Sequence, residues 1–255
     1  MDIRVEQIGK ACLITLDKPE KRNALTRGDI TQLTQVITEA GTRPDISGLV
    51  VTGNGAFCAG ADLERLPESI GTTSTRRRES IEGPAQALIR SLLDVPVPTV
   101  AAVDGPAVGM GFDLALACDS LLVGPDGWCM QGWGRIGLIP GTGGEMLLRA
   151  RAPGLLWRLL EHQTRIDAHL AEQWRIGERV DTATAREAAL ARVERLGAQL
   201  ARAALLGYVT LSRAEIKTRL NEHLAVCAAI QAELLGSADL VGRTGAVLPA
   251  RPSRT

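Results

Sequence analysis

Three glycine-rich turns are the parts of this sequence best suited to chemistry. They read GNGAFCAGADL (53–63), GPAVGMGFDLALACD (105–119) and GLIPGTGG (137–144), and each follows an apolar stretch of strand length. Glycine lets the backbone approach a ligand closely, and the unpaired N–H groups at a helix start suit a phosphate or a developing oxyanion. A single turn of this kind is weak evidence because tight turns need glycine anyway. Two such turns that meet in one cleft would be more specific.

Groups that could move a proton are few in this region. The segment WCMQGWGRIGLIPGTGG (128–144) contains no acid and no histidine. Its tryptophans offer flat walls with one N–H donor each and cannot act as bases. The three histidines lie in the last third of the chain on polar faces, and the five cysteines are widely spaced among apolar neighbours. We therefore expect buried reduced thiols, no metal site and no Ser/His/Asp centre.

The elements that must hold these turns alternate along the first 150 residues. A helical pattern with apolar residues at turn spacing starts at Thr26 and ends at Gly41. Alternation of strands with such helices predicts an α/β layer. The expected strands are 11–16, 48–53, 98–105 and 120–124.

The last third of the sequence lacks strand signals after about residue 153. Segments 153–180, 184–205 and 212–235 show the apolar spacing of amphipathic helices. We expect this helical region to cap the α/β core or to pack against a neighbouring subunit.

Bulk composition excludes several partner classes. The chain has 255 residues, enough for one large domain. Its 29 basic and 29 acidic residues balance, so no overall field attracts nucleic acid or an acidic membrane. The N-terminal segment lacks the apolar core of a signal peptide, and no stretch reaches the ~18 apolar residues of a membrane span. A soluble cytoplasmic protein is the expectation.

Four segments, taken in order, resemble the signatures of the crotonase superfamily, the enoyl-CoA hydratase/isomerase fold. They are LDKPEKRNALT (16–26), VVTGNGAFCAGADL (50–63), AAVDGPAVGMGFDLALACD (101–119) and GLIPGTGG (137–144). The resemblance implies a spiral of ββα repeats over residues 1–190 and a helical trimerisation region over 191–255. It also implies a homotrimer or hexamer, and no cofactor other than the coenzyme A of the substrate.

The same resemblance implies a site for acyl-CoA thioesters. The backbone N–H groups of Ala61 and Met110 correspond to the two donors that hold the thioester oxygen, where such donors supply several kcal/mol. Most relatives have glycine at the second position, and methionine supplies the same N–H with a bulkier side chain. The remaining substrate contacts implied are Lys21, Arg22, Ala24, Leu25, Ala59, Asp62 and Gly109, with Ala59 as the adenine reader.

The carboxylates depart from the family pattern. Hydratases of this family use two glutamates, and the corresponding residues here are Asp113 and Trp133. Asp113 is one methylene shorter than glutamate. It is either the general acid/base, if burial raises its pKa, or a structural carboxylate that the dipole stabilises near a helix N-terminus. Glu145 is explained by a capping box at 142–145. Glu64 and Glu68 border the expected acyl pocket and are outside candidates.

Tryptophan at the second position also resembles the aryl-CoA dehalogenase branch, but the nucleophilic aspartate of that branch corresponds to Gly141. Three hypotheses stay open at this point: a hydratase or isomerase-like reaction run by Asp113, another crotonase reaction such as thioester hydrolysis, decarboxylation or retro-aldol cleavage, and non-catalytic acyl-CoA binding. In each of them we expect Trp133 to form an apolar wall beside the acyl chain.

Overall fold

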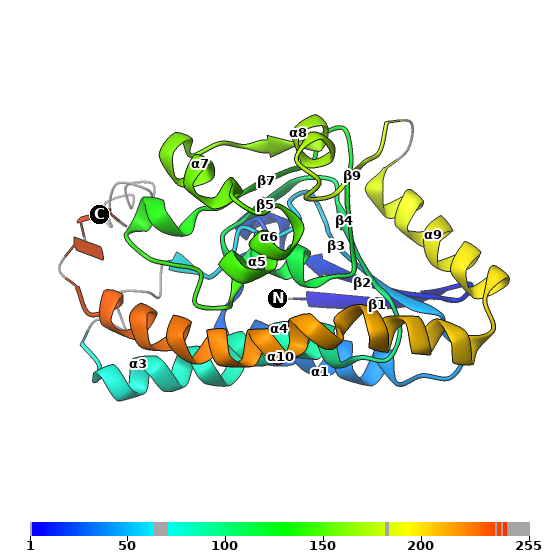
Figure 1. The fold of residues 1–255 in the computed structure, drawn as a ribbon, viewed down its shortest axis with the longest axis horizontal. Helices are drawn as coiled ribbons and strands as arrows, with labels where there is room; N and C mark the ends of the chain where they lie inside the picture. The colour runs from blue at the N-terminus through cyan, green and yellow to red at the C-terminus, as the bar shows by residue number, and fades with distance from the viewer. Residues whose placement is uncertain (1, 64–70, 182–183, 238, 241, 244–255) are drawn as a thin grey trace, which may run out of the picture.

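A six-stranded sheet forms the centre of the protein in the computed structural model, which describes residues 2–63, 71–181, 184–237, 239–240 and 242–243 (Figure 1). The first two strands form an antiparallel hairpin, and the others run parallel. The central strands are continuous apolar runs because both of their faces are covered. In sheet order the strands are β1 (Asp2–Ile8), β2 (Ala11–Asp17), β3 (Gly48–Gly53), β4 (Thr99–Val103), β6 (Ser120–Val123) and β9 (Glu178–Arg179).

A second, three-stranded sheet includes the start of the second glycine-rich turn. It consists of β5 (Pro106–Val108), β7 (Trp128–Met130) and β8 (Ile166–Asp167). The expectation of an entirely helical chain after residue 153 was wrong, because β8 and β9 lie there. Each of these strands has two residues and lies at the edge of its sheet, pairing Ile166 with Cys129 and Arg179 with Val123. Strands of two residues are too short to show the alternation of apolar and polar residues by which a strand is recognised in a sequence.

Helices cover both faces of the large sheet (Figure 1). On one face lie α1 (Arg27–Gly41) and α4 (Gln86–Asp94), which follows α3 (Ser74–Ser80) through one π-helical turn. The start of α1 is confirmed: Thr26 and Asp29 form a reciprocal capping box. On the other face α9 (Ala185–Gln199) packs small side chains such as Ala189 against the alternate residues of the strands.

The segment between the glycine-rich turns and α9 consists of short elements. They are α5 (Met110–Ala117), a 3-10 turn (Trp133–Ile136), α6 (Gly144–Arg151), α7 (Leu155–His162) and α8 (Ala168–Gln173). The long helix expected over 153–180 is thus two helices. The strand β8 separates them, and the side chain of Asp167 caps the second one.

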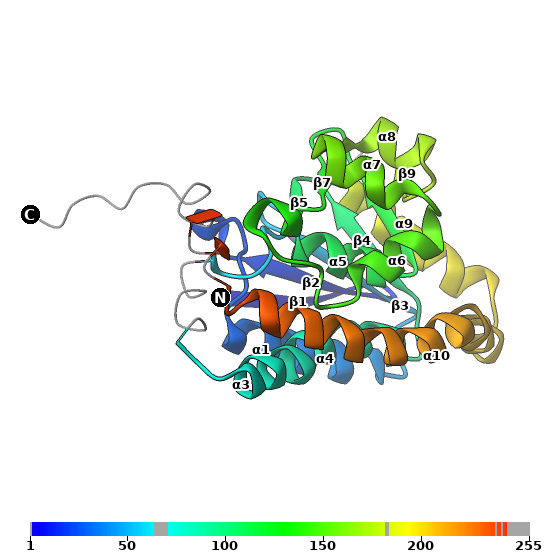
Figure 2. The ribbon, with the colours of Figure 1, turned by 60° about the vertical axis from the view of Figure 1, so that its left-hand side comes forward.

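The C-terminal helix α10 (Arg202–Leu234) has 33 residues and lies along α3 and α4 (Figure 2). The buried Arg213 anchors it by donating to Asp119 and to the carbonyl of Val97. A helical C-terminal region is therefore confirmed. The division at residue 190 falls inside α9 and stays a prediction. No helix among the described residues is long and apolar enough to cross a membrane.

Candidate active site

The turn after β2 is shaped by a buried asparagine. Arg22 and Asn23 both adopt positive φ, at 51° and 56°, a conformation that asparagine tolerates better than most residues. The Asn23 side chain accepts from the N–H of Lys18 at 2.7 Å and donates to the carbonyl of Ala56 at 2.6 Å. This amide therefore ties the turn that carries the expected coenzyme A contacts to the loop after β3.

The peptide between Gly60 and Ala61 is oriented by Leu25. The N–H of Leu25 donates to the carbonyl of Gly60 at 2.8 Å, and the N–H of Asp62 donates to the carbonyl of Leu25 at 3.0 Å. In a trans peptide the N–H points away from the carbonyl, so the N–H of Ala61 points away from Leu25. It donates to no described residue.

The second expected donor begins helix α5. Gly109 adopts φ 55°, and its N–H bonds the carbonyl of Met130 at 3.0 Å. Met110 is the first residue of α5, where an N–H has no intrahelical acceptor, and no described residue accepts from it. A Cβ added to Gly60 would lie 3.2 Å from the Met110 nitrogen. The first two glycine-rich turns therefore meet, and each has an N–H that donates to none of the described residues.

Asp113 lies one turn into α5 with 1% of its surface exposed. Its Oδ2 accepts two hydrogen bonds, from Trp133 Nε1 at 2.9 Å and from Thr142 Oγ1 at 2.6 Å. Burial raises the pKa of the Asp113 carboxyl to about 7, while the hydrogen bonds from Thr142 and Trp133 act in the opposite direction. The second and third glycine-rich segments therefore converge on a single buried carboxyl that titrates near neutral pH.

The indole of Trp133 donates to Asp113, and its expected place as an apolar wall beside the acyl chain stays a prediction. One expectation about the third segment was wrong. The capping box at 142–145 is absent, because the Thr142 hydroxyl is turned toward Asp113 and Gly143 caps α6 without a side-chain hydrogen bond. Glu145 instead lies 3.1 Å from Arg149 and 3.2 Å from His223.

Comparisons with known proteins identify the family of the chain. A family model described as enoyl-CoA hydratase/isomerase matches residues 6–239. The chain belongs to this family.

Two relatives and one solved structure show how similar the chain is to individual known proteins. A probable enoyl-CoA hydratase of Rhodobacter capsulatus is 34% identical over 98% of the chain and 96% of its own length. The probable enoyl-CoA hydratase EchA14 of Mycobacterium tuberculosis is 41% identical over 55% of the chain, and the match spans 54%, about half, of that relative. A crystal structure of an enoyl-CoA hydratase from Bacillus halodurans has a TM-score of 0.87 at 21% identity, covering 96% and 99% of the two chains. The fold is thus the crotonase fold.

The side chains expected to contact coenzyme A lie beside the Ala61 turn. Lys21 and Arg22 are exposed and Leu25 is buried. The N–H of Ala59 donates to the carbonyl of Arg22 at 2.9 Å, so only its carbonyl is left to read an adenine. That these residues contact coenzyme A stays a prediction. Glu64 and Glu68 lie outside the described residues.

Sequence reasoning missed two residues of this site. Asn23 lies in the segment KRNAL, and asparagine is a residue type that favours positive φ. The sequence therefore contained a signal for its role in this turn. Thr142 had none, because its contact with Asp113 joins residues 29 positions apart.

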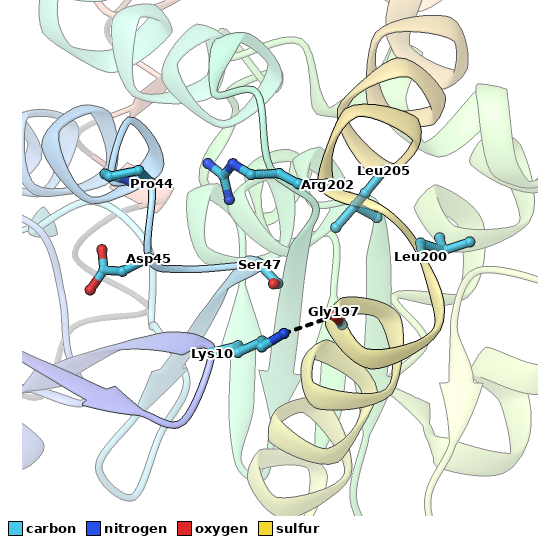
Figure 3. A pocket seen from close by; sticks show the side chains of 8 residues that line it. All are labelled: Lys10, Pro44, Asp45, Ser47, Gly197, Leu200, Arg202 and Leu205. Carbon is cyan, nitrogen blue, oxygen red and sulfur yellow. Dashed lines mark hydrogen bonds between the residues drawn. The ribbon is translucent and has the colours of Figure 1, made fainter.

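A groove shown in Figure 3 lies apart from these residues. It is formed where the turn after β1, the loop before β3 and the junction of α9 and α10 meet. Its two cations are engaged with carbonyl oxygens, Lys10 with Gly197 at 3.0 Å and Arg202 with Arg43 at 3.1 Å. These bonds serve the packing of the α9–α10 junction. The described residues include no cluster of three metal-binding side chains.

Proposed function

We propose that this protein is an acyl-CoA-processing enzyme that moves a proton on the substrate. In it, the N–H groups of Ala61 and Met110 hold the thioester oxygen, and Asp113 is the general acid/base. The proposal is supported by two adjacent N–H groups that donate to no described residue, by a buried carboxyl one helical turn after Met110, and by relatives named enoyl-CoA hydratases. Oriented donors of this kind stabilise charge on an oxyanion or enolate by several kcal/mol.

The hydrogen bond from Trp133 to Asp113 is the observation that favours isomerisation over hydration. Hydration of a double bond requires one group that deprotonates water and one that delivers a proton to carbon. The position of a second carboxylate holds an indole that donates to the first one. A single carboxyl suits removal of a proton from one carbon and its return to another, which is double-bond isomerisation.

The pKa of Asp113 suits a group that removes a proton from one carbon and returns it to another. With a pKa of about 7 the carboxyl is present in both protonation states at neutral pH. General acid/base groups work best when their pKa lies near the working pH. The carboxylate removes a proton next to the double bond, the electron pair passes into the enolate, and the same carboxyl then protonates the far carbon.

A panel of acyl-CoA thioesters tests the proposal. We expect 3-enoyl-CoA to be converted to 2-enoyl-CoA, little water addition to crotonyl-CoA, and loss of isomerisation in Asp113→Asn. Robust crotonyl-CoA hydration that Asp113→Asn leaves undiminished would contradict the assignment. Tight binding without turnover would identify a non-catalytic acyl-CoA binding protein. Free acid, decarboxylated or cleaved products would identify another reaction of the superfamily.

Assembly into a homotrimer or hexamer is part of the proposal. Large apolar side chains stand exposed on α10, at Tyr208, Leu211, Val226 and Ile230. A patch of this kind is typical of a contact surface between chains. Light scattering at micromolar concentration should give a multiple of the 27.1 kDa chain, whereas a stable monomer would contradict this part.

A further inference from the structure

The two oxygens of Asp113 have different surroundings. Oδ2 accepts from the Thr142 hydroxyl at 2.6 Å and from the Trp133 indole at 2.9 Å. No described residue donates a hydrogen bond to Oδ1. A Cβ added to Gly144 would lie 1.7 Å from Oδ1. Glycine at position 144 is therefore what leaves room for this oxygen.

This asymmetry decides where a proton sits on the neutral acid. A protonated carboxyl has one hydroxyl oxygen and one carbonyl oxygen, and an indole N–H is a donor only. The oxygen that already accepts two hydrogen bonds is the better carbonyl oxygen, so the proton belongs on Oδ1.

We propose that Thr142 is a positioning residue that, with Trp133, keeps Oδ2 as an acceptor and leaves Oδ1 as the atom that exchanges the proton with the substrate. This inference rests on the function proposed above. In the forward step the C–H bond breaks and an O–H bond forms at Oδ1, while the electron pair enters the enolate. In the return step the O–H bond at Oδ1 breaks and a C–H bond forms at the other carbon.

The backbone around Thr142 is held from two sides. The buried amide of Gln86 donates to the carbonyl of Gly141 at 2.9 Å and to the carbonyl of Leu224 in α10 at 2.8 Å. A Cβ on Gly143 would lie 2.7 Å from Leu220 Cδ1, so α10 presses on the loop there. With 2% of its surface exposed, Thr142 has little room to turn its hydroxyl away from Asp113.

The decisive variants are Thr142→Val, which keeps the shape and removes the hydroxyl, and Thr142→Ser, which restores it. A hydrogen bond to a carboxylate favours the charged form. We therefore expect the pH at half-maximal kcat to rise by about one unit in Thr142→Val, which is a tenfold change in the equilibrium, and to return in Thr142→Ser. Thr218→Val is the control, because the exposed Thr218 hydroxyl bonds only the carbonyl of Ala214.

A second readout does not depend on turnover. The carboxyl carbon of Asp113 can be titrated by NMR in substrate-free protein labelled with 13C aspartate, its signal identified by its loss in Asp113→Asn. The titration midpoint of Asp113 measured in this way is expected to rise in Thr142→Val by about the same amount as the midpoint of the kcat profile. This titration tests the role of Thr142 even where no acyl-CoA is converted, and so separates its failure from that of the proposed function.

Two results would overturn the inference. One is an Asp113 titration in Thr142→Val that coincides with that of the wild type. The other is a Thr142→Ser midpoint displaced as far as that of Thr142→Val, since serine keeps the hydroxyl and should keep the wild-type midpoint. If Thr142→Val does not fold, Thr142→Ala lacks the same hydroxyl and must show the same rise.

Discussion

The two halves of the candidate site are built by different means. The proposed donors, the N–H groups of Ala61 and Met110, are backbone groups oriented by hydrogen bonds between short segments, Leu25 with Gly60 and Gly109 with Met130. The proposed acid, Asp113, is a side chain whose surroundings come from Trp133 and Thr142 on a segment distant in sequence. Backbone donors tolerate a change of side chain, whereas the acid depends on each neighbouring side chain. Substitutions in the two halves should therefore have different effects.

The largest effect is expected where a backbone donor is removed. Proline at Ala61 has no N–H and should lower turnover by at least ~10²-fold, as loss of one oxyanion donor does. Met110→Gly is the matched control, because it keeps the N–H and removes only the side chain. We expect it to retain turnover and to accept bulkier acyl groups in steady-state assays. Equal losses in the two variants would show that the side chain matters more than the N–H.

The next effect concerns stability. The pKa of Asp113 rises from an ordinary 3.8 to about 7 on folding, so the folded state holds this proton more tightly than the unfolded state. The resulting stabilisation is complete below about pH 4 and is lost as the pH rises through about 7. Relative to Asp113→Asn, the wild type should lose up to roughly 4 kcal/mol across this window.

Urea unfolding of both proteins between pH 4 and 8 measures this difference. A wild-type curve that runs parallel to that of Asp113→Asn would show that the carboxyl is not desolvated.

A smaller effect is expected from Trp133→Phe, which keeps an aromatic ring and removes the indole N–H. Losing a donor to the carboxylate should raise the Asp113 midpoint in the pH profile of kcat. Selectivity among acyl-CoA thioesters should change as well, because the ring lies beside Gly109. An unchanged profile would mean that Thr142 alone holds Oδ2.

Restoring a second carboxylate tests the same position in the opposite direction. Trp133→Glu combined with Asp113→Glu should increase hydration of crotonyl-CoA over the wild type, because it recreates two carboxylates. Trp133→Glu alone is expected to cost stability, since an unpaired buried carboxylate is unfavourable. Thermal unfolding beside the hydration assay separates these outcomes. Hydration no higher in the double variant than in the wild type would contradict the assignment of the position.

The amino-acid sequence was enough to predict the strands 11–16 and 48–53, the helix that starts at Thr26, the glycine-rich turns and the family. These features follow from apolar runs, capping residues and glycines, which act over a few neighbouring positions. Asp113 and Trp133 could also be named from the sequence, as residues that replace two glutamates.

The contact between those two residues could be seen only in the folded protein. The indole of Trp133 and the hydroxyl of Thr142 reach one oxygen of Asp113 across 20 and 29 residues, and no local pattern encodes such a meeting. The two-residue strands β8 and β9 were undetectable for the same reason, since their only signal is the partner strand. Burial, which raises the pKa of Asp113, likewise exists only once α5, α6 and the Trp133 turn have packed together.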